Sequence, residues 1–267
     1  PFIEKVNAKG EIEYIDNPDA ENLEYLNQKP PPEGVVYTRE QRRAFGYAYY
    51  RRQLDGKPKH YIDTEIMGKY GSNFDGRPVY QEYWAEEMVC EYPLEAKYGY
   101  PVILGIDTTG LNPAVAFGQL EMGVLQIKHE LLALDMPFVP FVRDVLKPFL
   151  AQHYPGCQVV AYTDPANPRD SNRGETPVQV LRQYGIQAQN APTNKFKARL
   201  DSVISFLQRR GGLLIDKRCE KIIDGFRGGY HYRPLKISGV GQTFSSEPVK
   251  NEFSHLADAV QYLCNGI

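Results

Sequence analysis

The chain has 267 residues, of which 42% are hydrophobic and 24% charged, and a net charge of −2, as is typical of soluble globular proteins. It has no run of about 18 apolar residues and no signal-peptide pattern, so neither a membrane span nor a secretory leader is expected. The four cysteines lack CxxC spacing, which disfavours a zinc site or a disulfide framework and indicates a reducing compartment.

The first 100 residues predict an irregular extension rather than a compact core. Turn-forming pairs such as Asn17-Pro18 and the run Pro30-Pro31-Pro32 interrupt it. A helix is expected over residues 38–54 with Thr38 as its N-cap. Short strands are expected over residues 59–66 and 78–83.

From residue 101 the pattern of apolar residues becomes regular. The predicted elements are strands over 102–107, 114–121 and 124–133, a helix over 138–152, a strand over 158–163, a helix over 177–184, a strand over 186–188, a helix over 194–210, a strand over 213–215, a helix over 217–226, a hairpin over 229–247 and a helix over 254–263. Met122-Gly123 predicts a hairpin turn, Pro148 a kink or an early helix end, and Ser254 an N-cap. This order predicts an α/β fold: a mixed sheet with helices on both faces.

Three aspartates stand at positions that suit a divalent-metal site. Asp107 ends the first apolar strand, Asp164 follows the strand over 158–163, and Asp258 lies early in the last helix. A carboxylate at a strand end loses hydration when it is partly buried, and a divalent cation compensates several carboxylates at once. A single aspartate is more often a turn or cap residue, but three in this order predict a metal centre.

A carboxylate metal centre suits hydrolysis of a phosphodiester, in which water is activated and the leaving oxygen is neutralised. Two Mg²⁺ or Mn²⁺ ions about 3.5–4 Å apart perform both tasks, and both ions prefer oxygen ligands. Asp107, on the central strand, is predicted to bridge the two ions. Asp164 and Asp258 are each predicted to hold one of them.

The most specific segment of the sequence is Pro-Val-Lys-Asn-Glu-Phe-Ser-His-Leu-Ala-Asp-Ala over residues 248–259. On a helix, His255, Asp258, Ala259 and Tyr262 share a face. Asp258 lies within the first turn or so, where the helix dipole favours a carboxylate.

The chain resembles the C-terminal nuclease region of the large terminase subunits of tailed bacteriophages. The resemblance covers residues 100–267 and extends weakly to residues 17–23 and 76–80. It rests on Gly-Ile-Asp107, the strand into Asp164-Pro165-Ala166, the helix with Arg199, Cys219, and the sequence Lys250-Asn251-x-x-Ser254-His255-x-x-Asp258-Ala259.

This resemblance implies an RNase H-like fold for residues 101–267, with residues 1–100 as an extension or linker from an upstream ATPase part. It implies a two-metal endonuclease that cuts concatemeric double-stranded DNA during viral genome packaging. The small terminase subunit and the portal ring are the implied partners, and the host cell cytoplasm, not the virion, is the implied location. No GxxxxGK[ST] motif occurs and the chain begins at Pro1, so ATP hydrolysis is expected only from a part removed or lying upstream.

Basic residues concentrate between residues 193 and 236, where 11 Lys and Arg stand against 4 Asp and Glu. Such a stretch suits DNA phosphates, and a solvated helix face or salt-bridge partners are open alternatives. The predicted DNA contacts are Lys195, Lys197, Arg199, Arg227 and Arg233.

Two residues of the last motif are expected near the metals. Lys250 is predicted to contact phosphate or orient water, the alternative being a structural ion pair. His255 is predicted to orient a metal ligand through a hydrogen bond or to contact phosphate. The alternative is a local capping role. The glycine-bearing segment 228–247 is expected to gate access of DNA, the alternative being an ordinary exposed hairpin.

Two other functions remain open. Ile106-Asp107-Thr108-Thr109-Gly110 also suits the phosphate-binding turn of actin-like or sugar-kinase phosphotransferases, but that fold is duplicated and only one copy is visible. The other open function is that of a non-catalytic RNase H-like module that binds DNA or a portal ring. Three retained aspartates favour the nuclease.

Overall fold

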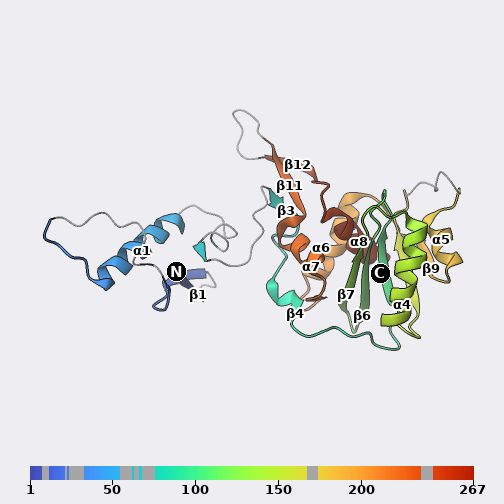
Figure 1. Ribbon diagram of the computed structural model, residues 1–267, viewed down its shortest axis with the longest axis horizontal. Coiled ribbons are helices and arrows are strands. Elements are labelled where there is room, and N and C mark those ends of the chain that lie inside the picture. Colours follow the sequence, from blue (N-terminus) through green and yellow to red (C-terminus); the bar gives the residue numbers. More distant parts are fainter. Residues whose placement is uncertain are drawn as a thin grey trace. The chain divides into compact units, whose positions relative to one another are not determined.

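A computed structural model describes residues 1–7, 12–21, 23, 33–54, 62, 66–67, 76–166, 174–235 and 243–267. The chain divides into two compact units, Pro1–Asn73 and Phe74–Ile267 (Figure 1). Most of the strand predicted over 59–66 and the hairpin tip at 238–241 lie outside the described residues.

Unit 1 contains an antiparallel hairpin and a helix. Strands β1 (Phe2–Val6) and β2 (Ile12–Asp16) pair, and α1 (Arg39–Leu54) follows. The predicted cap is confirmed, because the Gln41 N–H donates to Thr38 Oγ1 while the Thr38 N–H donates to Gln41 Oε1. The hairpin was not predicted from the sequence. Its core is small and aromatic: Phe2, Ile62 and Ile66, with Tyr14, Tyr47, Tyr50, Leu54 and Met67 packed around them.

Residues 74–100 belong to unit 2 and include β3 (Arg77–Pro78), the 3₁₀ turn η3 (Glu86–Met88) and β4 (Val89–Cys90). The strand predicted over 78–83 is wrong beyond Pro78, since turns follow it. Polar side chains of the sheet hold residues 94–97: Asp216 accepts from the Leu94 N–H at 2.6 Å, and Gln119 accepts from the Lys97 N–H at 2.9 Å. The compact unit therefore begins well before residue 101.

Unit 2 is built on a seven-stranded mixed sheet with the order β4-β10-β7-β6-β5-β8-β9. Its centre is β5 (Val102–Asp107), all six residues of which are buried because helices cover both sides. The other strands are β6 (Ala114–Glu121), β7 (Val124–Leu132), β8 (Val159–Thr163), β9 (Gln187–Asn190) and β10 (Leu213–Asp216). The predicted hairpin β6–β7 is confirmed, with positive φ at both Met122 and Gly123, as a tight primed turn requires.

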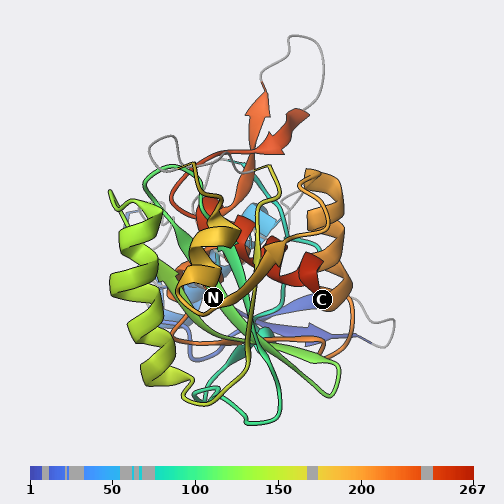
Figure 2. The ribbon, with the colours of Figure 1, turned by 90° about the vertical axis from the view of Figure 1, so that its right-hand side faces the viewer.

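Helices cover both faces of this sheet, as predicted. One face packs on the segment 138–153 and α5 (Pro177–Gln183), around Leu104, Phe117 and Leu146. The other packs on α6 (Phe196–Leu207), α7 (Glu220–Asp224) and α8 (Ser254–Gly266). In Figure 2, α4 in yellow-green and α6 in orange lie on opposite sides of the green strands.

Three helix details differ from a regular pattern. The predicted interruption near Pro148 takes the form of a π turn, η4 (Phe141–Leu146), between α3 (Phe138–Pro140) and α4 (Lys147–His153). The helix predicted over 217–226 is shorter and continues as a second π turn, η5 (Gly225–Gly229). Ser254 is not the N-cap of α8 but its first residue; its hydroxyl donates to the Asn251 carbonyl at 2.7 Å.

The predicted hairpin after residue 229 is confirmed, but it belongs to a second sheet. Strands β11 (His231–Leu235) and β12 (Thr243–Pro248) are antiparallel, and β3 pairs with the other edge of β11. Arg77 lies over the rings of Tyr232 and Phe244, at 4.9 and 5.4 Å. This sheet thus connects the start of unit 2 to the strand that leads into the last motif.

The half-buried His129 on β7 predicts that the stability of the fold depends on pH. His129 Nδ1 lies 2.6 Å from the Tyr154 hydroxyl, and burial lowers the His129 pKa from 6.5 to about 4. Between these values the unfolded chain binds the proton and the folded chain does not, so folding stability falls as the pH is lowered. The slope from this residue is at most about 1.4 kcal/mol per pH unit.

The measurement is urea unfolding of the wild-type chain and of His129→Gln between pH 4 and 7. Glutamine keeps a hydrogen-bonding group near Tyr154 but has no proton to gain, so its stability curve is expected to be flatter. Parallel curves for the two proteins would show that His129 does not titrate in this window.

Candidate metal centre

The carboxyl ends of two neighbouring strands bring Asp107 and Asp164 to one edge of the sheet. Strands β5 and β8 are parallel, and Ile106 stands opposite Thr163 in their register. The aspartates that follow these partners are therefore on adjacent strands, whose spacing is about 4.8 Å. Asp107 is 2% exposed and Asp164 is half-buried.

Helix α8 approaches this edge closely because β5 has a glycine at its centre. A Cβ on Gly105 would stand 1.9 Å from the Ala259 carbonyl oxygen and 2.5 Å from the Leu263 nitrogen. The backbone of α8 thus lies directly on the backbone of β5. The first turn of α8 lies beside the carboxyl end of β5, where its dipole favours negative charge.

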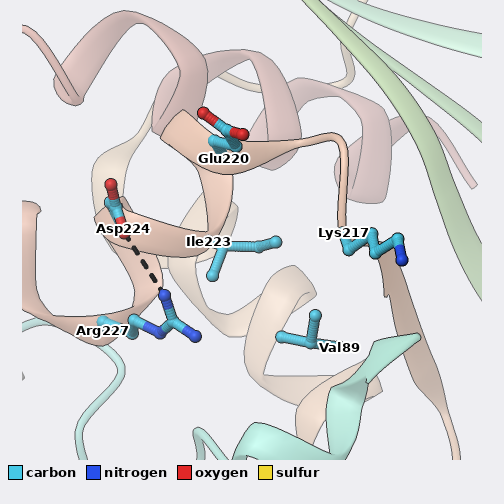
Figure 3. A pocket seen from close by; sticks show the side chains of 6 residues that line it. All are labelled: Val89, Lys217, Glu220, Ile223, Asp224 and Arg227. Atoms are coloured by element: carbon cyan, nitrogen blue, oxygen red, sulfur yellow. Dashed lines mark hydrogen bonds and ion pairs between the residues drawn. The ribbon is translucent and has the colours of Figure 1, made fainter. Parts of the chain in front are cut away.

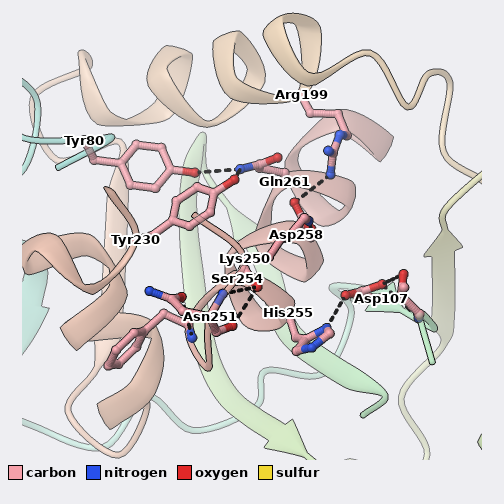
Figure 4. A network of polar contacts seen from close by, with 12 residues as sticks. Tyr80, Asp107, Arg199, Tyr230, Lys250, Asn251, Ser254, His255, Asp258 and Gln261 are labelled. Carbon is pink, nitrogen blue, oxygen red and sulfur yellow. Dashed lines mark hydrogen bonds and ion pairs between the residues drawn. The ribbon is translucent and has the colours of Figure 1, made fainter. Parts of the chain in front are cut away.

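His255, in this first turn, contacts Asp107 directly (Figure 4). Its Nδ1 lies 2.8 Å from Asp107 Oδ2, and this hydrogen bond raises the pKa of the His255 ring. The other oxygen of Asp107 accepts from the backbone N–H of Thr109 at 3.0 Å and from its hydroxyl at 2.6 Å. Asp107 is thus oriented from both sides, while Thr108 Oγ1 beside it is buried and has no hydrogen-bond partner.

Asp258, one turn further along α8, is held by two cations. Its Oδ1 accepts from Arg199 at 2.9 Å and its Oδ2 from Lys250 at 2.6 Å. The Arg199 and Asp258 side chains are only 9% and 7% exposed. Burial lowers the pKa of the Arg199 guanidinium, but the Asp258 carboxylate outweighs burial and raises that pKa above its ordinary value. The Arg199 guanidinium therefore stays charged beside Asp258.

Tyr262, on the third turn, connects the other aspartate to the same face. Burial raises the pKa of its hydroxyl and the nearby Asp164 carboxylate adds to this, while the Arg199 guanidinium lies 4.8 Å from the centre of its ring. Asp164 also accepts from the Ala166 N–H at 2.8 Å. The face predicted for His255, Asp258 and Tyr262 is confirmed, and each residue contacts a different group.

The donors at this edge fit a divalent cation in kind, since two carboxylates and an imidazole are available and the hydroxyl of Thr108 lacks a partner. They are not gathered around one point: among the described residues, no three or more His, Cys, Asp or Glu side chains are close enough to hold a metal. An ion would therefore have to draw Asp107 and Asp164 together. The prediction that Asp258 is a ligand stays a prediction, and its two ion pairs oppose it.

The predicted DNA contacts have different surroundings. Lys195 and Lys197 are exposed at the start of α6, and Arg233 is exposed on β11. Arg199 is buried and forms a salt bridge with Asp258. It therefore matches the alternative of a salt-bridge partner and not the predicted contact with phosphate. Arg227 pairs with Glu86 at 2.7 Å.

Two contacts of this site were missed by the sequence analysis. The Thr109 hydroxyl on Asp107 had a local signal, since a threonine two residues after an aspartate often closes such a turn. The proximity of Tyr262 to Asp164 had only the helical spacing to indicate it.

A pocket elsewhere in unit 2 has different chemistry (Figure 3). It has a volume of about 280 Å³ and is lined by Val89, Ile223, two basic residues, Lys217 and Arg227, and two acidic residues, Glu220 and Asp224. Arg227 and Asp224 pair with each other across its wall. It contains none of the three predicted aspartates, so it is not the candidate metal centre.

Comparison with known proteins identifies the fold. No protein-family model and no curated protein sequence matches the chain. The structure is similar to the large terminase of a thermophilic bacteriophage, with a TM-score of 0.52 and 15% identity, covering 87% of this chain and 54% of that one. It is also similar to the nuclease domain of the P22 large terminase, with a TM-score of 0.51 and 16% identity, covering 69% of this chain and 89% of that one.

The predicted RNase H-like fold and the resemblance to large terminases are thus confirmed at the level of the fold. The chain spans about half the length of the thermophilic phage terminase. In the described part of the chain, no helix has the length and apolar character that crossing a bilayer requires.

Proposed function

We propose that this chain carries the nuclease of a viral DNA-packaging terminase, a metal-dependent endonuclease that cuts concatemeric double-stranded DNA. The observation that supports it most is the pair Asp107 and Asp164 at the ends of adjacent parallel strands, with α8 packed directly against them. The similarity in fold to terminase nuclease domains supports the same activity.

Each residue of the site has a separate role in this proposal. Asp107 and Asp164 would hold the divalent ions, and α8 would supply a third ligand. Bound Mg²⁺ or Mn²⁺ would activate a water and neutralise the leaving oxygen of the phosphodiester. Thr109 fixes one Asp107 oxygen, so that the carboxylate is oriented before DNA arrives. Lys250 forms an ion pair with Asp258, and its side chain is 73% exposed. Its ammonium group can therefore contact a phosphate of bound DNA.

The partners in this proposal are those of a packaging motor. Double-stranded DNA is held through its phosphates by exposed basic residues, with Lys195, Lys197 and Arg233 as the candidates. An ATPase part upstream, the small terminase subunit and the portal ring complete the assembly, in the cytoplasm of the host cell.

Metal dependence is the first test of this function. Incubation of supercoiled plasmid with the chain and Mg²⁺ or Mn²⁺ is expected to give nicked and linear DNA, and excess EDTA to abolish both products. The chain without DNA is expected to bind metal weakly, because an ion must first draw Asp107 and Asp164 together against their mutual repulsion, and phosphates must complete its shell. Agarose gels and calorimetric titration measure the two effects. Undiminished cleavage in EDTA would rule out a metal-dependent nuclease.

A phosphotransferase is less well supported by the turn after β5. In this turn Thr109 donates both its N–H and its hydroxyl to Asp107. Those donors are the groups that a phosphate-binding turn would direct at a nucleotide. Here both donors of Thr109 are hydrogen-bonded to Asp107 and orient its carboxylate, which suits a metal ligand.

A further inference from the structure

We propose that Arg77 contacts a phosphate of bound DNA and that, together with Lys195 and Lys197, it forms a basic track for the backbone of the duplex. The inference rests on the proposed nuclease function and adds a contact that the sequence analysis did not predict. It extends the DNA-binding surface from the start of α6 onto the three-stranded sheet β12-β11-β3.

The backbone of β3 holds Arg77 at a fixed place on β11. Arg77 stands opposite Tyr232 in the register of the two strands. The residue before it must lack a side chain, because a Cβ on Gly76 would stand 2.5 Å from the Tyr232 carbonyl oxygen and 2.3 Å from the ring of His231. Gly76 therefore lets the chain lie directly on β11. The point from which the Arg77 side chain leaves the backbone is thus fixed before any ligand binds.

Two aromatic rings then order the guanidinium of Arg77. It lies 4.9 Å from the centre of the Tyr232 ring on β11 and 5.4 Å from that of the Phe244 ring on β12. Arginine stacks on aromatic rings through its planar face, which leaves the N–H groups at the edge of the plane available to a ligand. Because the side chain is already ordered, less conformational entropy is lost on binding.

The charge of Arg77 is exposed and has no acidic partner. Among the described residues, no carboxylate forms an ion pair with it. By contrast, Arg199 is paired with Asp258. Arg227 is paired with Glu86. An ordered guanidinium without a counter-charge is suited to an anion, and its fork of N–H donors matches two oxygens of a phosphate.

Tyr232 also connects Arg77 to the start of α6. The rings of Tyr232 and Phe196 meet edge to face, with their centres 6.5 Å apart. Phe196 is the first residue of α6, and Lys195 and Lys197 on either side of it are exposed. In the described part of the chain, neither lysine is paired with a carboxylate. Three cations without acidic partners are therefore gathered around one aromatic contact.

The course of α6 connects the basic track to the candidate metal centre. The Arg199 N–H donates to the Lys195 carbonyl at 3.1 Å, one helical turn away, and the Arg199 guanidinium contacts Asp258 on α8. Each strand of duplex DNA has a phosphate about every 3.4 Å along the helix axis. A strand bound at the metal centre therefore has further phosphates for the neighbouring cations. A single phosphate ion would use only one of them, so the track suits a polyanion.

Fluorescence anisotropy of a short labelled duplex, in EDTA so that it is not cut, tests this proposal. The affinity is measured over a range of salt concentrations for wild type and Arg77→Gln. Loss of one phosphate contact is expected to weaken binding about tenfold at low salt. It is also expected to reduce the slope of log affinity against log salt by about 0.9. Arg77→Lys keeps the charge without the planar fork, so it is expected to keep the slope and lose part of the affinity.

Arg209→Gln is the matched control. Arg209 is also exposed, and its guanidinium lies 5.3 Å from the centre of one ring, that of Phe206. It stands beyond the opposite end of α6, whose 12 residues span about 18 Å. Its replacement is expected to leave both the affinity and the salt slope unchanged.

Phe244→Leu tests the ordering of the guanidinium separately from its charge. Loss of one ring is expected to weaken DNA binding about threefold with an unchanged salt slope, because the charge remains. If Arg77 only stabilises the three-stranded sheet, Arg77→Gln lowers the thermal unfolding midpoint but leaves the salt slope at the wild-type value. That result, or an unchanged affinity in a folded Phe244→Leu protein, would overturn the proposal.

Nicking kinetics give a second readout under cleavage conditions. Arg77→Gln is expected to raise the KM for supercoiled plasmid with kcat unchanged, because the contact is remote from the reacting phosphate and binds substrate and transition state alike. Wild-type KM and salt slope in a folded Arg77→Gln protein would remove Arg77 from the DNA-binding surface, while nicking by the wild type leaves the nuclease standing. A wild-type chain that neither binds the duplex nor nicks plasmid would instead overturn the nuclease function itself.

Discussion

Replacing Asp107 with asparagine is expected to lower the rate of DNA cleavage at least about a hundredfold, since a metal ion contributes several kcal/mol to the transition state. The neutral amide has one weak oxygen ligand and cannot bridge two ions. It keeps the oxygen that accepts from Thr109, so the turn after β5 is expected to stay intact. Initial rates of plasmid nicking and the thermal unfolding midpoint are the measurements.

Asp144→Asn is the matched control for this substitution. Asp144 is an exposed aspartate in η4, and it pairs with its neighbour Arg143 at 2.7 Å. Its replacement is expected to leave the cleavage rate within about twofold, as surface ion pairs contribute little. Near-wild-type cleavage by a folded Asp107→Asn protein would remove Asp107 from the reaction.

Adding one methyl group at Gly105 is expected to destabilise unit 2 by about 3 kcal/mol or more, and to impair cleavage as well. The new Cβ would meet the backbone of α8 at Ala259 and Leu263, and a backbone cannot turn aside as a side chain can. Helix α8 must move away from β5, which separates His255 from Asp107. Urea unfolding and the nicking rate of Gly105→Ala measure the two effects.

Gly118→Ala is the comparison, since Gly118 stands opposite Ile103 on the next strand. There a Cβ would meet the methyl ends of Leu263 and Leu125 at 3.1 and 3.2 Å, and these can shift. The loss of stability is expected to be about 1 kcal/mol, with cleavage retained. Equal effects at the two glycines would mean that the close contact of α8 with β5 has no special importance.

The centre of the seven-stranded sheet was predictable because its strands are nearly uniform apolar runs. β5 and β8 are of this kind, and both were predicted within one residue of their ends. The hairpin β1–β2 was not predicted, because its strands mix charged and apolar residues, although Asn7 and Gly10 between them are turn-forming residues. Residues 89–97 were placed outside the compact unit because side chains distant in sequence, such as Asp216, hold them.

The placing of Asp107 and Asp164 at the carboxyl ends of adjacent strands was predictable, but the contacts of the α8 residues were not. Helical spacing shows that His255 and Asp258 share a face, yet it does not show which of them meets a strand. The partner of Asp258 is Arg199, 59 residues earlier in the chain. Only the packing of α6 on α8 brings that cation to the carboxylate and makes it an ion pair.

The three-stranded sheet gives the site a mechanical connection to whatever precedes it in the chain. β3 enters unit 2 and is paired with β11 at Tyr232 and His231 alone. β11 is paired in turn with β12, which ends two residues before Lys250. Tension on the chain upstream of Arg77 therefore pulls on β3. This strand is hydrogen-bonded to β11, and β11 is hydrogen-bonded to β12, which ends close to Lys250. A change of tension there would therefore alter the position of Lys250, and with it one of the two cations that hold Asp258.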